Sequence, residues 1–292
     1  MKKIFAVCLS VLIILSACSL SAWAITFSVG APLGSGIISS ASNRTVAPGV
    51  TYSTAVYRDS SNDLQRVFAL SFNPKTSNYM PFVYSKYSGY GATTINSATD
   101  AESKYGLNIV GGINGSFFSF VGTCCNTYGG VNISDGKVIQ GQNSFGPTYM
   151  LVFDSAGNTD LVYSKVSYAL KVNGSPWSGA LEYINMYPYT LGTGIYYYDT
   201  SCGNNTDTNS PGVEIVFNKV NNTELTVGGT LKGTVAEKRN NVSSGGSIGR
   251  NQFVLYASNS SPWAASLRAL SIGDTAEITV TETIAAAKTK ME

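Results

Sequence analysis

Asn114 and Gly115 are the residues of this chain best suited to form a polar site, within the stretch IVGGINGSFFSF at 109–120. Asn-Gly is a strong turn signal, because both residues tolerate positive φ. The side-chain amide offers two donors and one acceptor at a fixed position, and the glycine lets a ligand approach the backbone. Phe117 and Phe118 would point to opposite sides of an extended backbone. Taken alone, these residues favour a turn with core aromatics over a pocket.

The residue types that the chain lacks exclude several catalytic mechanisms and metal sites. The chain contains no histidine, which excludes Ser-His-Asp catalysis, Cys-His catalysis and histidine-bound metals. No P-loop pattern occurs. Acid–base chemistry would fall to the 17 aspartates and glutamates, and Asp135, in the pair Asp135-Gly136, is a nearby candidate. We expect neither a cofactor nor a bound metal.

Three cysteines, Cys124, Cys125 and Cys202, lie outside the N-terminal leader. An odd number leaves at least one thiol free or paired with another chain. Adjacent cysteines seldom bridge each other, so a bond from Cys202 to either neighbour is the open alternative. Because no histidine and no C-x-x-C accompanies them, ordinary loop cysteines are favoured over metal ligands.

The first 24 residues have the pattern of a secretory signal peptide. Met1-Lys2-Lys3 is a basic start, 4–15 is apolar, and Ala22-Trp23-Ala24 is an A-x-A cleavage site. We expect cleavage after Ala24 and a secreted protein. The alternative is a lipoprotein anchored at Cys18, because Leu-Ser-Ala-Cys resembles a bacterial lipobox.

Charge and hydropathy exclude two classes of partner. Without Lys2 and Lys3 the chain has 17 basic and 17 acidic residues, so nothing favours nucleic acid or an anionic membrane. No segment after the leader is long and apolar enough for a membrane helix. We expect no nucleic acid and no membrane span.

Composition and periodicity predict a β-rich fold. Hydrophobic residues make up 43% and charged residues 12%, which suits a sizeable core, and Tyr, Ser, Thr, Asn and Gly are abundant. Apolar alternation and short apolar runs predict strands at 65–72, 107–113, 149–153, 213–217, 253–257 and 275–283. In the first of these, Phe68, Leu70 and Phe72 share one face. The expected class is α+β, with mixed and antiparallel sheet and few helices.

Two helices and one boundary are expected. Thr94 is a plausible N-cap of a helix that ends before Gly106. Ser261 and Pro262 read as N-cap and N1 of a short helix through Leu270. The sequence pattern changes near Pro176. Before it, strand and helix signals alternate with many glycines; after it come a tyrosine-rich segment, polar loops and regularly spaced strand signals. We therefore expect a first part at 25–175, a β-rich subdomain at 176–285 and a tail at 286–292.

Three blocks of sequence resemble the phosphodiester glycosidase family, which includes N-acetylglucosamine-1-phosphodiester α-N-acetylglucosaminidase. The blocks are GGINGSFFSF, CNTYGGVNISDGKV and SFGPTYMLVFDSAGN, in family order. The residues that match the family pattern are Asn114, Gly115, Phe117 and Phe118 in the first, Gly129, Gly130, Asp135 and Gly136 in the second, and 154–157 in the third. The resemblance reverses the reading of the first block, from a plain turn to a sugar-phosphate pocket.

The resemblance implies hydrolysis of the bond between an anomeric carbon and a phosphodiester, on a carbohydrate or sugar-phosphate polymer. It implies catalytic roles for Asn114 and Asp135. It implies substrate contacts from Gly115, Phe117, Phe118, Gly129 and Gly130. The region 183–283 is similar to a β-rich insertion of bacterial members, whose pattern T-x-T-x-x-x-G-x-E-[IV]-V matches Thr206, Thr208, Gly212 and Glu214.

One departure from the family pattern affects the expected activity. The family continues beyond this insertion with an Arg-Thr-Ala-x-Gly strand and an Asp-Gly-Gly-Gly-Ser turn, and neither occurs here. We therefore expect the front portion of a family member, inactive by itself. The alternative is a non-catalytic secreted glycan-binding or envelope protein, suggested by exposed-looking tyrosines at Tyr187, Tyr189, Tyr196, Tyr197 and Tyr198.

Overall fold

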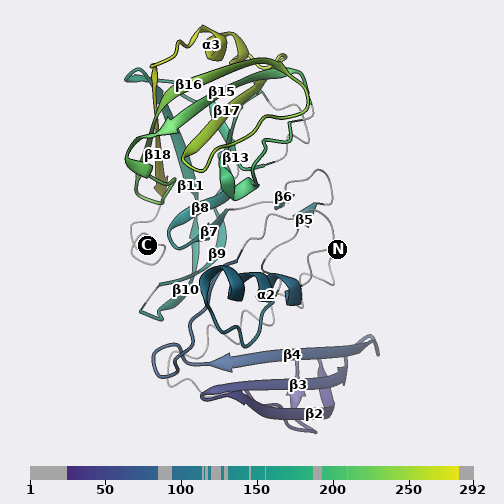
Figure 1. Cartoon of the computed structure of the whole chain (residues 1–292). Helices are drawn as coiled ribbons and strands as arrows, with labels where there is room; N and C mark the ends of the chain where they lie inside the picture. The colour runs from purple at the N-terminus through teal and green to yellow at the C-terminus, as the bar shows by residue number, and fades with distance from the viewer. Residues whose placement is uncertain are drawn as a thin grey trace. The chain divides into compact units, whose positions relative to one another are not determined.

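The computed structural model is mostly β-sheet with few helices, as the sequence predicts (Figure 1). It describes residues 25–84, 94–113, 115, 118–119, 126–127, 131–144, 146–154, 156–186, 193–208 and 210–282. The predicted leader, Cys18, Cys124, Cys125 and the tail lie outside these ranges. The chain divides into two compact units, residues Met1–Pro81 with Ser155–Asn158 and residues Phe82–Asp154 with Thr159–Glu292.

The first unit is an antiparallel four-stranded sheet in chain order: β1 (Pro32–Leu33), β2 (Gly36–Ala47), β3 (Val50–Arg58) and β4 (Leu64–Phe72). The segment that precedes β1 covers one face. Ser53 Oγ donates to the Ile25 carbonyl at 2.7 Å, and Phe27 is buried against Ile38 and Ala55. Because neighbours along a strand point to opposite faces, every second residue of β3 and β4 lies on the other face.

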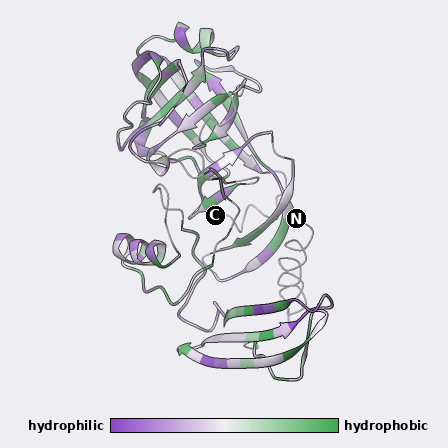
Figure 2. Ribbon diagram, turned by 90° about the vertical axis from the view of Figure 1, so that its right-hand side faces the viewer, coloured by the Kyte–Doolittle hydropathy of each residue, from purple (hydrophilic) through white to green (hydrophobic). Residues whose placement is uncertain are grey.

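The predicted strand at 65–72 corresponds to β4. The face that carries Phe68 and Leu70, predicted to be apolar, is not the face that packs on the core. Val67 and Ala69 pack on the core of the unit, whereas Phe68 is 65% exposed and Leu70 is exposed as well. Figure 2 shows the alternation of hydrophobic and hydrophilic residues along these strands. Val67 and Ala69 are partly buried, because the segment that precedes β1 covers that face.

The second unit contains a ten-stranded mixed sheet in the order β12-β11-β18-β16-β15-β17-β14-β13-β8-β7. Among the described strands of this sheet, β13 and β14 pair in parallel and the other pairs are antiparallel. The bounds are β7 (Asn132–Ser134), β8 (Lys137–Gln142), β11 (Val166–Val172), β12 (Ser175–Pro176), β13 (Leu181–Ile184), β14 (Ile195–Tyr198), β15 (Gly212–Lys219), β16 (Thr230–Val242), β17 (Gln252–Ser258) and β18 (Thr275–Glu282).

This sheet takes strands from both sides of the predicted boundary at Pro176, so the inserted subdomain stays a prediction. The remaining strands form two hairpin pairs, namely β5 (Phe118–Ser119) with β6 (Asn126–Thr127), and β9 (Thr148–Phe153) with β10 (Thr159–Ser164). The aspartate-led block at 154–157 lies in the turn of the second pair, where Gly157 has φ 78°.

The centre of the large sheet is buried on both faces. In β15, Ile215 and Phe217 belong to one core cluster and Val216 to the other. Three consecutive tyrosines of β14 fill these cores, with exposed fractions of 2%, 0% and 0% for Tyr196, Tyr197 and Tyr198. The idea of an exposed tyrosine platform is therefore wrong for these three, because β14 lies between two paired strands. Tyr187 and Tyr189 lie outside the described residues.

Both helices are found. Helix α2 spans Thr94–Tyr105 as predicted, and Gly106, with φ 66°, donates its N–H to the Glu102 carbonyl at 2.9 Å. Helix α3 is shorter than predicted, at Ala264–Ala269. Ser261 does act near its start, where its Oγ accepts the Trp263 N–H at 3.3 Å.

The predicted strand at 107–113 is wrong, because this described segment pairs with no other strand. Leu107 and Ile113 are exposed, at 38% and 88%, and Ile109 and Val110 are half-buried. No helix among the described residues has the length and hydropathy needed to cross a membrane.

Candidate functional site

The predicted site residues fall unevenly on the described part of the chain. Asn114, Phe117, Gly129 and Gly130 lie outside it. Gly115 is exposed, and a Cβ built on it would meet no atom within 4 Å. Phe118 belongs to β5 and pairs with Thr127. The substrate-binding and catalytic roles of these residues therefore remain predictions. For Gly115, the structure adds that space for a ligand is open beside its backbone.

Asp135 and Gly136 form the two-residue loop of the β7–β8 hairpin. Ser134 and Lys137 face each other across the loop, and both loop residues have positive φ, 51° and 68°. A type I′ turn requires this conformation, and Asp-Gly is one of its preferred sequences. The Gly136 carbonyl accepts the Val227 N–H at 3.0 Å. The turn is thus fixed from outside the hairpin, while Asp135 itself is exposed.

The residue after this turn enters a group of charges around the buried side chain of Asp199. Lys137 Nζ lies 3.2 Å from Asp199 Oδ2 and 2.8 Å from Glu224 Oε2. Lys219 Nζ lies 3.8 Å and 2.8 Å from the same two atoms. Two cations and two carboxylates therefore meet where β8, the end of β14 and the end of β15 approach one another.

Asp199 is at the centre of this group and is fully buried, with 0% exposure. Its Oδ1 accepts from Asn185 Nδ2 at 3.0 Å and from the Ser201 N–H at 2.8 Å. Its Oδ2 accepts from the Tyr197 hydroxyl at 3.2 Å. Buried carboxylates need such donors, because burial without partners is costly. The Asp199 cluster comprises Lys137, Asn185, Tyr197, Asp199, Lys219 and Glu224.

The neighbours of Asp199 control the pKa values in the cluster. Burial alone would raise the pKa of Asp199, but the charges of Lys137 and Lys219 outweigh it and leave that pKa below its usual value. Burial would likewise lower the pKa of Lys137, and Asp199 and Glu224 instead raise it. Burial, with the negative charge of Asp199, holds the pKa of Tyr197 well above its usual value.

The Asp199 cluster holds the Asp135 turn in place through Lys137. It fixes the first residue of β8, two places after Asp135, with ion pairs and hydrogen bonds inside the unit. Sequence reasoning missed it, because its charges come from distant parts of the chain. The available signal was a lone aspartate directly after the apolar run Ile195–Tyr198.

A second buried network joins the residues of the T-x-T-x-x-x-G-x-E pattern. Thr206 Oγ1 donates to Glu214 Oε1, and Thr208 Oγ1 donates to the same atom at 3.2 Å. Arg239 Nη1 lies 3.3 Å from Glu214 Oε2. A Cβ on Gly246 would come within 2.1 Å of Arg239 Nη1 and 2.5 Å of Glu214 Oε2, so a side chain at this position would displace the ion pair. The spacing of the pattern thus serves a contact with a fully buried carboxylate.

Within the described ranges, no three His, Cys, Asp or Glu side chains gather closely enough to hold a metal ion. The chemistry that the described residues offer is an exposed carboxylate on a fixed turn, supported by the ion pairs of Lys137 and Lys219 with Asp199 and Glu224.

Comparison with known proteins bears on the fold alone. No model of a protein family matches the chain, and no curated protein matches it. A solved structure of a protein from Synechocystis, described as hypothetical, has a similar fold with a TM-score of 0.61 and 15% sequence identity. The match covers 87% of this chain and 43% of the solved chain. This chain thus spans less than half the length of that protein.

Proposed function

We propose that this chain is the front part of a glycosidase that cleaves sugar-1-phosphodiesters, of the GlcNAc-1-phosphodiester type. The reaction breaks the bond between the anomeric carbon and the phosphate oxygen. The observation that carries the proposal is the Asp135 turn, which offers an exposed carboxylate at a position fixed by Lys137 and the Gly136 carbonyl. The sequence blocks around it supply the identity of the substrate.

The geometry suits a leaving group that needs little help. A phosphodiester departs readily, so less general-acid assistance is required than for an alkyl glycoside. The Asp135 carboxylate would place water or stabilise positive charge at the anomeric carbon. The Asn114 amide would hydrogen-bond the sugar or the phosphate. A second acidic group on the other side of the bond would come from a segment outside this chain, as the family pattern implies.

The Glu214 network supports the resemblance in the second half of the chain. The pattern residues Thr206, Thr208 and Glu214 meet in one buried contact, which gives the pattern a physical reason. We propose that 176–285 corresponds to the β-rich insertion of the family. The alternative is a glycan-binding module that uses exposed tyrosines. Tyr196, Tyr197 and Tyr198 cannot contribute to such a surface, because they are buried.

Hydrolysis of a GlcNAc-1-phosphodiester tests this function. The chain alone is expected to release no sugar above a buffer control. The chain joined to a family segment with the Asp-Gly-Gly-Gly-Ser turn is expected to turn over. In the joined protein, Asp135→Asn should keep the turn, because Asn-Gly also favours type I′, and should lower turnover by about 10²-fold, as for a lost acid–base group.

The matched control is Asp160→Asn, the same change at an exposed position of β10, and it should leave turnover unchanged. Full turnover of the Asp135→Asn protein would return Asp135 to a purely structural role. Multiple turnover by the chain alone would contradict its incompleteness.

A further inference from the structure

The four-stranded sheet of the first unit has one covered face and one open face. Residues 25–31, which precede β1, cover the face that carries Ile38 and Ala55. The opposite face follows from the registers of β2, β3 and β4, in which Tyr52 pairs with Arg44 and Leu70, and Thr54 pairs with Ser42 and Phe68. We call this the open face. Its exposed or half-buried residues are Ser40, Ser42, Arg44, Tyr52, Thr54, Val56, Arg58, Arg66, Phe68 and Leu70, and Val50, at one end of β3 on the same face, is buried.

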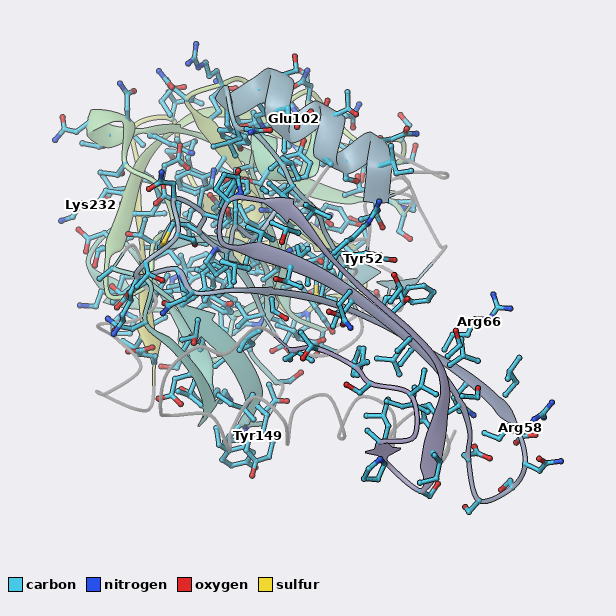
Figure 3. The ribbon with its side chains drawn as sticks, turned by 90° about the horizontal axis from the view of Figure 1, so that it is seen from below. Tyr52, Arg58, Arg66, Glu102, Tyr149 and Lys232 are labelled. Atoms are coloured by element: carbon cyan, nitrogen blue, oxygen red, sulfur yellow. The ribbon has the colours of Figure 1, made fainter. Side chains whose placement is uncertain are left out.

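All the charge on these strands is positive and lies on the open face. Arg44, Arg58 and Arg66 are the charged residues of β1–β4, which contain no Asp, Glu or Lys. Figure 3 shows Arg58 and Arg66 extending away from the ribbon of this sheet. Arg58 donates to the Asn62 carbonyl at 2.8 Å, and no ion pair within the described residues engages Arg44 or Arg66. Arginine is the side chain best suited to carboxylate, sulfate and phosphate groups.

The carboxylates nearest in sequence lie in the β3–β4 turn. Asp59 Oδ1 accepts the N–H groups of Ser61 and Asp63 at 2.9 Å and 3.0 Å. Asp59 Oδ2 accepts from Gln65 Nε2 at 2.9 Å. These bonds bind Asp59 to its own turn, at the end of the sheet far from Arg44, so most of the open face carries positive charge only.

The spacing of the arginines selects an extended ligand. Arg44 and Arg66 lie two strands apart and four residues apart along the sheet, because their partners on β3 are Tyr52 and Val56. Strand spacing and rise then separate their Cα atoms by about 17 Å. A single small anion cannot reach both. A polymer with repeated negative groups can.

The residues between the arginines favour a glycan over a nucleic acid. Arg44 stacks over the Tyr52 ring at 5.2 Å from its centroid, which occupies that ring. Phe68 is left with a free face, in one row with the hydroxyls of Ser42 and Thr54. Single-stranded nucleic acid stacks successive bases on several free rings. One ring flanked by hydroxyls instead suits a sugar.

We propose that the open face binds an acidic polysaccharide, a glycan chain with repeated carboxylate, sulfate or phosphate groups. The arginines pair with the anions, Phe68 packs against a sugar ring, and Ser42 and Thr54 bond its hydroxyls. This site uses none of the residues assigned to the glycosidase, so it stands whether or not that function does.

Binding of galacturonate oligosaccharides to the full secreted chain, measured by calorimetry, tests the proposal. Maltooligosaccharides of equal length are the neutral comparison, and a dT oligonucleotide is the nucleic-acid comparison. We expect saturable binding of the galacturonate chains that weakens as salt rises. The double variant Arg44→Gln/Arg66→Gln should bind about ten-fold more weakly or worse, and Phe68→Ala should also bind more weakly.

Arg250→Gln, which removes the same charge from an exposed turn of the second unit, is the matched control and should bind like the parent chain. An unchanged affinity in the double variant would overturn the proposal, as would an equal loss in Arg250→Gln. Equal binding of maltooligosaccharides would overturn the role of charge. Tighter binding of dT would assign the face to nucleic acid instead. Unchanged urea unfolding of each variant shows that the comparison is between folded proteins.

Discussion

Replacing Asp199 by alanine is expected to lower the free energy of unfolding of the second unit by about 3–5 kcal/mol, the usual cost of removing one partner from a buried ion pair. Lys219 would keep only Glu224, and the Asn185 amide, the Ser201 N–H and the Tyr197 hydroxyl would lose their acceptor. Urea unfolding followed by tryptophan fluorescence measures it.

Tryptophan fluorescence reports on the right unit. Of the three tryptophans, Trp23 lies in the predicted leader, and Trp177 and Trp263 stack at 5.7 Å in the second unit. The control is Glu277→Ala, which breaks an exposed pair with Lys232 at 2.8 Å and should cost less than about 1 kcal/mol. Equal effects of the two changes would show that the Asp199 cluster is not a stabilising element.

The cost of Asp199→Ala should also depend on pH. A carboxyl whose pKa is lower in the folded than in the unfolded chain stabilises the fold above its unfolded pKa, about 3.9 for Asp. This contribution is lost as the pH falls through the folded pKa. Lys137 has a raised pKa, so its contribution is present below about pH 10.4 and is lost at higher pH. The difference between parent and variant should therefore be constant near neutrality and shrink below about pH 4.

Replacing Glu214 by alanine is expected to cost about 3 kcal/mol of the same unfolding free energy, because Thr206 and Thr208 lose a buried acceptor and a cavity forms. Arg239 loses less, since Glu237 also pairs with it at 2.9 Å. Glu214→Gln keeps an acceptor for the threonines and should cost about 1 kcal/mol. The same urea unfolding measures both changes, and equal losses would mean that packing alone, without the hydrogen bonds, explains the position.

Local signals in the sequence predicted much of the second unit. Thr94 and Gly106 bracket α2 because capping is a local property, and the apolar alternation of 275–283 marks β18 because Ala276, Ile278 and Val280 are buried. The Asp135-Gly136 turn was predictable for the same reason. These signals depend on neighbours within a few residues.

Other features could not be predicted from the sequence, because they depend on which strands pair in the sheet. The apolar run 107–113 reads as a buried strand, but no described strand pairs with it. Tyr197 was expected to be exposed as part of a tyrosine-rich segment and is buried, because a core cluster covers that face of β14. The Asp199 cluster joins positions 137, 199 and 219, which only the order of the strands brings together. Phe68 faces solvent because the covering segment lies on the other face.

The proposed glycosidase function requires that the segment around Asn114 and Asp135 binds a sugar-1-phosphodiester. Saturation-transfer NMR of the chain with the methyl diester of GlcNAc-1-phosphate tests it most directly, with free GlcNAc as the comparison ligand. Asn114→Ala should change stability by only about 1–2 kcal/mol, the range for a lost turn hydrogen bond. For the parent chain we expect saturation transfer to the N-acetyl and anomeric protons of the diester. In the folded Asn114→Ala chain we expect this transfer to be lost. Absence of transfer to the diester, or equal transfer in the variant, would contradict it.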